Sequence, residues 1–298
     1  MKPPNQQIHL QNTSITLFIK RDDLLHPHIS GNKYRKLKYN LAEAKARGLK
    51  TLLTFGGAYS NHIAAVAAAG KEAGFLTIGI IRGEELKGEI SKNPTLSFAA
   101  SCGMSLEFVS RETYRDKTSE QFINSLTKVF GPFYMLPEGG TNAFAVKGCE
   151  EILEQDDSVF DYICCAVGTG GTISGIINSA QPHQKVLGFP ALQGSFLKNE
   201  VSQLAAGGNW DLIQGYEFGG YGKIDSNLIA FVNNFREMHK IPLDPVYTGK
   251  MLFGVMDMIS KGFFPEESKI LAIHTGGLQG IAGMNLKLKS KNLPLINL

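Results

Sequence analysis

Short runs of branched and aromatic residues alternate along this chain with longer segments of helical spacing. The run at 15–19 precedes a helical segment that opens near Asn32 and ends before Gly48, and a second run follows at 51–55. A strand, a helix and another strand in this order indicate a βαβ unit with parallel strands. The alternation continues to residue 273, so the sequence predicts an α/β fold built on mostly parallel sheets.

The same pattern predicts the remaining elements and a division into domains. We expect strands at 77–81, 106–109, 133–136, 162–167, 185–189 and 270–273, and helices near 61–73, 95–101, 119–129, 143–153, 196–205, 227–239 and 250–260. The chain has 298 residues, of which 43% are hydrophobic, which suits two medium domains. The break at 137–142 marks the crossing between them. We therefore expect two open three-layer α/β/α domains, a larger one from 1–36 with 141–298 and a smaller one from 37–140.

Composition excludes several classes of partner. Thirty basic residues and 27 acidic residues give a net charge of +3, without the basic block that nucleic-acid binding favours, so we expect no nucleic-acid partner. No apolar run is long enough to serve as a signal peptide or to span a membrane, which favours a cytoplasmic protein. The four cysteines have neither metal-ligand nor disulfide spacing, so we expect buried thiols and no metal.

Lys33 occupies an unusual place for a cation. If Asn32 caps the helix, Lys33 lies in its first turn, where the partial positive charge of the helix terminus disfavours an ammonium and lowers its pKa. A partly neutral lysine is a nucleophile for carbonyl groups, which points to Schiff-base chemistry. The alternative is an ordinary lysine on the surface.

The glycine-rich segment 167–175 predicts a phosphate site between a strand and a helix. In Gly168-Thr169-Gly170-Gly171-Thr172, the glycines let the backbone approach a ligand while amides at a helix terminus face an anion. Ile173 stands where the dinucleotide fingerprint needs a third glycine, and the Gly-Lys-Ser/Thr of the P-loop is absent. A single phosphate on a smaller cofactor fits better, and a plain tight turn is the alternative.

A second strand-to-helix loop, 56–62, carries Ser60, Asn61 and His62. A helix terminus with a hydroxyl, an amide and an imidazole can hold a substrate carboxylate. The alternative is an ordinary cap in which Ser60 or Asn61 bonds to the helix amides.

Two tyrosines and a threonine complete the candidate residues. Tyr221 and Tyr247 lie in the turns 219–222 and 245–250, where a phenol can stack on a flat ring or bond to a reacting group, or simply pack. Thr275 follows the strand at 270–273 and can hydrogen-bond to a heteroatom of a cofactor, or cap a turn.

Five segments taken in order, 31–37, 57–62, 168–172, 245–250 and 274–277, resemble those of the pyridoxal-phosphate enzymes that comprise 1-aminocyclopropane-1-carboxylate deaminase and D-cysteine desulfhydrase. The resemblance covers nearly the whole chain. It implies a fold of the tryptophan synthase β-subunit type (fold type II), pyridoxal 5'-phosphate in the cleft between two domains, a small amino-acid substrate and a homodimer.

The resemblance also implies a role for each candidate residue. Those expected to bind the cofactor are Lys33 through a Schiff base, Lys36 and the 168–172 loop (Gly168, Thr169, Gly170, Gly171 and Thr172) at the phosphate, Asn61 at the ring hydroxyl, Thr275 at the pyridine nitrogen, and Tyr247. Those expected at the substrate are Ser60, Asn61 and His62, with Tyr221 and Tyr247 on the reacting face and Lys33, Ser60, Tyr221 and Tyr247 as catalytic residues.

Three positions depart from the pattern of the deaminases. Thr248 stands where they resemble one another in having a glutamate, Tyr59 where many relatives carry glutamine, and Cys149 where an aromatic residue is frequent. The pattern at Thr248 favours D-cysteine desulfhydrase. The alternatives are the cyclopropane deaminase, a β-replacement synthase of the same fold type and a non-catalytic cofactor-binding protein.

Overall fold

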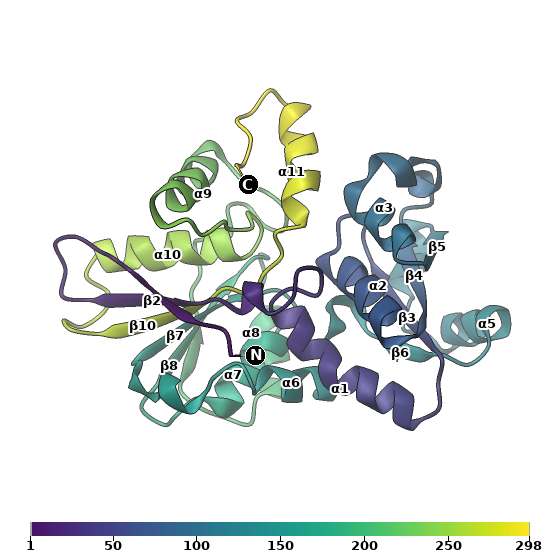
Figure 1. Cartoon of the computed structure of the whole chain (residues 1–298), viewed down its shortest axis with the longest axis horizontal. Coiled ribbons are helices and arrows are strands. Elements are labelled where there is room, and N and C mark those ends of the chain that lie inside the picture. The colour runs from purple at the N-terminus through teal and green to yellow at the C-terminus, as the bar shows by residue number, and fades with distance from the viewer. Residues whose placement is uncertain (1, 298) are drawn as a thin grey trace.

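The computed structural model describes residues 2–297 and contains two separate sheets (Figure 1). The first has the order β1 (Asn5–Ile8), β2 (Thr16–Lys20), β10 (Lys269–Ile273), β7 (Tyr162–Val167), β8 (Lys185–Pro190), β9 (Trp210–Leu212). The second has the order β5 (Met104–Val109), β4 (Leu76–Arg82), β3 (Thr51–Gly56), β6 (Tyr134–Leu136). Neighbouring strands are parallel throughout, except that β1 runs antiparallel to β2. The predicted mostly parallel α/β fold is thus confirmed.

Helices cover both faces of each sheet. The helices are α1 (Asn32–Ala46), α2 (Asn61–Ala73), α3 (Pro94–Ser101), α4 (Arg111–Arg115), α5 (Glu120–Phe130), α6 (Ala143–Cys149), α7 (Gly171–Ser179), α8 (Phe196–Leu204), α9 (Ser226–His239), α10 (Thr248–Ser260) and α11 (Gly280–Lys289). The core on one face of the first sheet holds side chains of α9, α10 and α11, and the core on the other face holds those of α6, α7 and α8. In the second sheet α1, α2 and α3 pack on one face, and α4 and α5 pack on the other. The proposed division into domains at residues 36 and 140 stays a prediction.

The buried strand β7 shows how sequence determines these layers. Side chains of a strand alternate between the two faces of a sheet. Accordingly Cys164 packs in the core beside α10, while its neighbour Cys165 packs in the core beside α7. Both thiols are fully buried, and Cys149 is buried as well, whereas Cys102 is half-buried. The two adjacent cysteines therefore serve as small hydrophobic residues of two different cores.

The structure differs from the sequence prediction at a few elements. The sequence analysis does not predict strands β1 and β9 or helices α4 and α11. A polar edge strand, a three-residue strand, a five-residue helix and a glycine-containing helix carry weak periodicity. Helix α6 ends at Cys149 instead of near residue 153. Beyond it the amides of Glu151 and Ile152 bond to carbonyls three residues back, so the chain continues as a tighter turn.

The described chain contains neither a helix that could span a membrane nor a cluster of potential metal ligands. Between residues 2 and 297, no helix is both long enough and apolar enough to cross a membrane. Over the same residues, no three His, Cys, Asp or Glu side chains come together as metal ligands could.

Candidate active site

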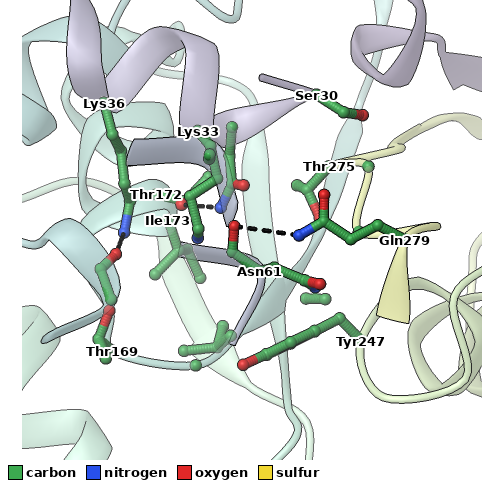
Figure 2. A pocket seen from close by; sticks show the side chains of 18 of the residues that line it. Ser30, Lys33, Lys36, Asn61, Thr169, Thr172, Ile173, Tyr247, Thr275 and Gln279 are labelled. Carbon is green, nitrogen blue, oxygen red and sulfur yellow. Dashed lines mark hydrogen bonds between the residues drawn. The ribbon is translucent and has the colours of Figure 1, made fainter. Parts of the chain in front are cut away.

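A cavity opens where loops that follow β6, β7 and β10 meet the N-terminal turns of α1 and α2 (Figure 2). Carboxyl ends of parallel strands and helix N-termini converge there, which is where α/β folds bind their ligands. The candidate residues that line it are Lys33, Lys36, Asn61, Gly168, Thr169, Gly170, Thr172, Tyr247 and Thr275. The cavity therefore brings together most of the residues that the sequence singled out.

Gly31 brings Lys33 into this cavity. Its φ is +61°, and a Cβ atom built on it would lie 2.0 Å from the carbonyl oxygen of Thr275. Only glycine allows the chain to pass so close to the end of β10. Gly31 is also the N-cap of α1, so the expectation that Asn32 caps the helix is wrong. The Asn32 amide instead donates to Thr172 Oγ1 at 2.8 Å, which ties the start of α1 to α7.

The Lys33 amine is poised to be neutral. Burial, and secondly the neighbouring Lys36 ammonium, lowers the pKa of Lys33 to about 7. Among residues 2–297 no hydrogen-bond acceptor or carboxylate pairs with Lys33 Nζ. A half-deprotonated amine without a partner in this cavity is a nucleophile for an aldehyde or ketone.

The N-terminus of α7 forms an anion cradle. Gly170, with φ +82°, precedes this nine-residue helix, and no side chain caps it. Within the described residues, the amides of Gly171, Thr172 and Ile173 donate to no protein acceptor. Unpaired amides and the helix dipole together favour an anion at this place.

Lys36 supplies a cation beside the cradle. It is 2% exposed, and its Nζ donates to Thr141 Oγ1 at 3.0 Å and to the Gly139 carbonyl at 3.2 Å. Thr141 Oγ1 in turn lies 2.6 Å from Thr169 Oγ1. Burial lowers the pKa of Lys36, and a bound phosphate would compensate for that loss of solvation.

Asn61 and Thr275 present unused polar groups to the same cavity. The Oδ1 atom of Asn61 is buried without a hydrogen-bond partner, which is rare unless a ligand completes the site. Gly277 allows this approach, because a Cβ there would lie 2.8 Å from Asn61 Nδ2. Thr275 is 7% exposed, and its hydroxyl has no partner in the described chain.

Ser60 and His62 lie beside the cavity wall. Ser60 Oγ caps α2 by accepting from the Ile63 amide at 3.3 Å. Thr54 Oγ1 donates to the Leu136 carbonyl and lies 2.9 Å from His62 Nε2, so Nε2 carries the proton. Burial lowers the pKa of His62 well below its usual value, so the ring is neutral. Neither side chain is part of the lining, and their roles toward a substrate stay predictions.

Tyr247 lines the cavity, whereas Tyr221 lies just outside its wall. Their ring centroids are 6.1 Å apart with planes at 64°, an edge-to-face pair. Burial raises the pKa of Tyr247 well above its ordinary value. Tyr221 is 54% exposed, and partial burial of its phenol raises its pKa as well. Both phenols are neutral near pH 7. Neutral phenols can donate a proton or a hydrogen bond to a reacting group.

Asp244 holds Tyr247 in place. Its buried carboxylate accepts from the amides of Val246, Tyr247 and Thr248 at 2.7–3.2 Å. The Thr248 hydroxyl also bonds to Asp244 Oδ1 at 3.0 Å and is fully buried. Thr248 therefore faces the helix cap and is not part of the cavity lining.

The sequence did not single out several residues of the wall. Gly139 lines the cavity, and Thr141 two residues later bonds to Lys36. Both follow β6 in a glycine-containing loop, as the predicted site loops follow their strands, and this position was the signal in the sequence. Gln279 bonds to the Asn61 carbonyl at 3.3 Å, an interaction across 218 residues that no local pattern indicates (Figure 2).

The donor set fits pyridoxal phosphate. A free amine suits its aldehyde, a helix terminus with Lys36 suits its phosphate, and Asn61 and Thr275 hold unpaired groups for a polar ring. Fold and cavity together thus define the class of a cofactor-dependent enzyme that binds pyridoxal phosphate.

Comparison with known proteins agrees with this class. The family model described as pyridoxal-phosphate dependent enzyme matches residues 4–276. A protein of Pyrococcus horikoshii named "Putative 1-aminocyclopropane-1-carboxylate deaminase" is 33% identical, over 92% of this chain and 88% of that protein. The mitochondrial bifunctional D-cysteine desulfhydrase/1-aminocyclopropane-1-carboxylate deaminase of Arabidopsis thaliana is 33% identical, over 89% of this chain and 73% of that protein.

A solved structure extends the likeness to three dimensions. The crystal structure of a homologue of 1-aminocyclopropane-1-carboxylate deaminase superposes with a TM-score of 0.81 and 30% identity, over 97% of this chain and 94% of that one. The chain belongs to the family of pyridoxal-phosphate dependent enzymes that includes 1-aminocyclopropane-1-carboxylate deaminases and D-cysteine desulfhydrases.

Proposed function

We propose that this enzyme is a D-cysteine desulfhydrase, which converts D-cysteine and water to pyruvate, hydrogen sulfide and ammonia. The observation that carries the proposal is Thr248. Deaminases resemble one another in having a glutamate at this place, whereas here a fully buried threonine bonds to Asp244. A glutamate would bring a second carboxylate against the buried Asp244, a costly arrangement of like charges.

Lys33, Lys36 and the N-terminus of α7 would have separate roles in the proposed reaction. Bound pyridoxal phosphate supplies an electron sink that stabilises negative charge at the α-carbon of an amino acid. Lys33, whose amine lies in the cavity, would be the residue that holds the cofactor. A free Lys33 amine, whose pKa burial lowers to about 7, would be the base for the α-proton. The N-terminus of α7 and Lys36 would hold the phosphate.

Groups around Tyr247 would act on the other end of the substrate. Breaking the bond between the β-carbon and sulfur places negative charge on the departing hydrosulfide. A neutral phenol can protonate that hydrosulfide to hydrogen sulfide or stabilise it by hydrogen bonding. The high pKa of Tyr247 keeps that phenol protonated. Ser60, at the N-terminus of α2, would lie beside the substrate carboxylate with the amide of Asn61.

A second candidate is 1-aminocyclopropane-1-carboxylate deaminase, the activity in the name of the Pyrococcus horikoshii relative. That substrate has no α-proton, so ring opening needs a nucleophile or removal of a β-proton. Ser60, Tyr247 and Lys33 would be the groups for that step.

One assay separates the two functions. Purified holoenzyme is incubated with D-cysteine, L-cysteine or the cyclopropane amino acid, and sulfide, pyruvate and 2-oxobutyrate are measured, with Lys33→Ala as the control. The proposal predicts sulfide and pyruvate in equal amounts from D-cysteine. Sulfide from L-cysteine alone refutes it, and 2-oxobutyrate from the cyclopropane substrate alone supports the second candidate. We also expect a homodimer, which light scattering would measure.

A further inference from the structure

The loop that carries Tyr221 has an unusual backbone. Phe218, Gly219, Gly220 and Gly222 all have positive φ, between 51° and 112°. Two hydrogen bonds form within the loop. The Gly220 amide donates to the Glu217 carbonyl at 2.9 Å, and the Lys223 amide donates to the Gly220 carbonyl at 3.2 Å. Glycine-rich segments of this kind have many conformations of similar energy, so something outside the loop must select this one.

Lys250 provides that external support. Its ammonium donates to the carbonyls of Glu217 and Gly220 at 2.7 and 2.8 Å. These are the same two carbonyls that accept the internal bonds of the loop. Charge-assisted hydrogen bonds are about twice as strong as neutral ones, so the two Lys250 bonds hold the loop more strongly than its two internal amide bonds do.

The place of Lys250 is otherwise unfavourable for a cation. It is 1% exposed and lies in the first turn of α10, where the helix dipole repels positive charge. Among the described residues no carboxylate forms an ion pair with it. The Glu217 carboxylate is engaged by the Gly215 amide, and the Asp244 carboxylate by the turn before α10. An apolar side chain would fill the same space without this penalty.

The helix that holds the loop also carries the other tyrosine. Tyr247 is the N-cap of α10 and lines the cavity, and Tyr221 packs edge-to-face against it. Lys250 is three residues beyond Tyr247. One helix end thus fixes Tyr247 through Asp244 and the Tyr221 loop through Lys250.

We propose that Lys250 is a positioning residue whose ammonium fixes the 217–222 loop on the N-terminus of α10 and so sets Tyr221 against Tyr247 beside the cavity. The consequence for turnover rests on the proposed function. The effect of Lys250 on the geometry of the loop does not depend on the proposed function.

The charge of Lys250 is sensitive to pH. Burial lowers its pKa to about 8, while the carboxylates of Asp244 and Glu217, which face it from the two flanking segments, act in the opposite direction. Lys287 reaches the Gly222 carbonyl from the surface but does not touch Lys250. As the pH rises through about 8, Lys250 loses its proton and its two bonds to the loop weaken.

Hydrogen exchange by mass spectrometry tests the proposal on the holoenzyme without substrate. Lys250→Met keeps the length of the side chain and removes the donor. We expect the 217–223 segment to exchange at least about tenfold faster, with α10 unchanged, because opening now breaks fewer bonds. Lys261→Met is the matched control, since Lys261 is an exposed lysine at the end of the same helix, and the loop should then exchange as in the wild type.

Unchanged exchange of the loop in Lys250→Met overturns the proposal. If that variant does not fold, the wild type decides the question. Loop protection relative to α10 should then fall between about pH 7 and about pH 9, and a constant ratio over that range overturns the proposal. Because hydrogen exchange is measured without turnover, a failed desulfhydrase assay would not affect the test of Lys250. With D-cysteine, we expect Lys250→Met to lower kcat/KM while the yellow absorbance of the cofactor persists.

Discussion

Gly31→Ala tests how the chain delivers Lys33 to the cavity. A Cβ at position 31 would lie 2.0 Å from the Thr275 oxygen and 2.2 Å from its carbonyl carbon, both backbone atoms. Contacts this short do not occur, so either α1 or the end of β10 must move. The backbone at Gly31, with φ 61° and ψ −133°, is also strained for any L-residue.

The two effects give the expected magnitude. Strain of the backbone costs about 1–3 kcal/mol, and overpacking of a closed site costs about 1–3 kcal/mol more, so we expect the free energy of unfolding to fall by about 4 kcal/mol. Gly48→Ala is the matched control. Gly48 also has a positive φ, +67°, but nothing lies within 4 Å of its built Cβ, so only the backbone term of about 1 kcal/mol applies.

Urea unfolding and cofactor titration measure both consequences. Gly31→Ala should be less stable than Gly48→Ala by about 2–3 kcal/mol and should lose the yellow absorbance of bound cofactor, because Lys33 is displaced. Equal stability of the two variants, with full absorbance in both, would show that the close approach of Gly31 to Thr275 does not position Lys33.

Three further predictions concern the charges of the site. Lys36→Met should raise the Kd for pyridoxal phosphate about 10- to 100-fold, because a charged partner of the phosphate is lost; Lys38→Met, at an exposed surface ion pair, should leave it unchanged in the same titration. Asp244→Asn should lower the free energy of unfolding by about 1–3 kcal/mol and reduce kcat/KM, since one carboxylate oxygen that accepts amide protons becomes a donor; unchanged unfolding and kinetics would contradict this. The rate at which the apoprotein takes up pyridoxal phosphate should rise with pH through about 7 and then level off. Only the deprotonated Lys33 amine attacks, and its pKa is about 7. A rate that still rises at pH 9, as for an ordinary lysine, would contradict the lowered pKa.

The sequence predicts most of the fold because strand and helix patterns report burial directly. The strand at 162–167 and the helix at 61–73 have their predicted bounds. Helix α11 was not predicted, and Gly283 shows why. A Cβ there would lie 2.3 Å from the Tyr59 ring, so this glycine meets a contact from a distant segment and obscures the helical pattern.

The sequence predicts most of the candidate residues that line the cavity, but it does not give the main cause of the low pKa of Lys33. The low pKa of Lys33 was attributed to the helix terminus, whereas burial is the first cause and Lys36 the second. Burial of one side chain depends on the whole fold and cannot be read from its neighbours in sequence. The same holds for Thr141, which meets Lys36 across 105 residues and Thr169 across 28.

The role of Lys33 is tested most directly by identifying the lysine that binds the cofactor. Holoenzyme is reduced with borohydride, which makes the bond between the cofactor and its lysine permanent, and is then digested for peptide mapping by mass spectrometry. We predict a pyridoxyl phosphate group on Lys33 alone. Its appearance on Lys36 or Lys250, or on no lysine at all, would show that Lys33 does not bind the cofactor.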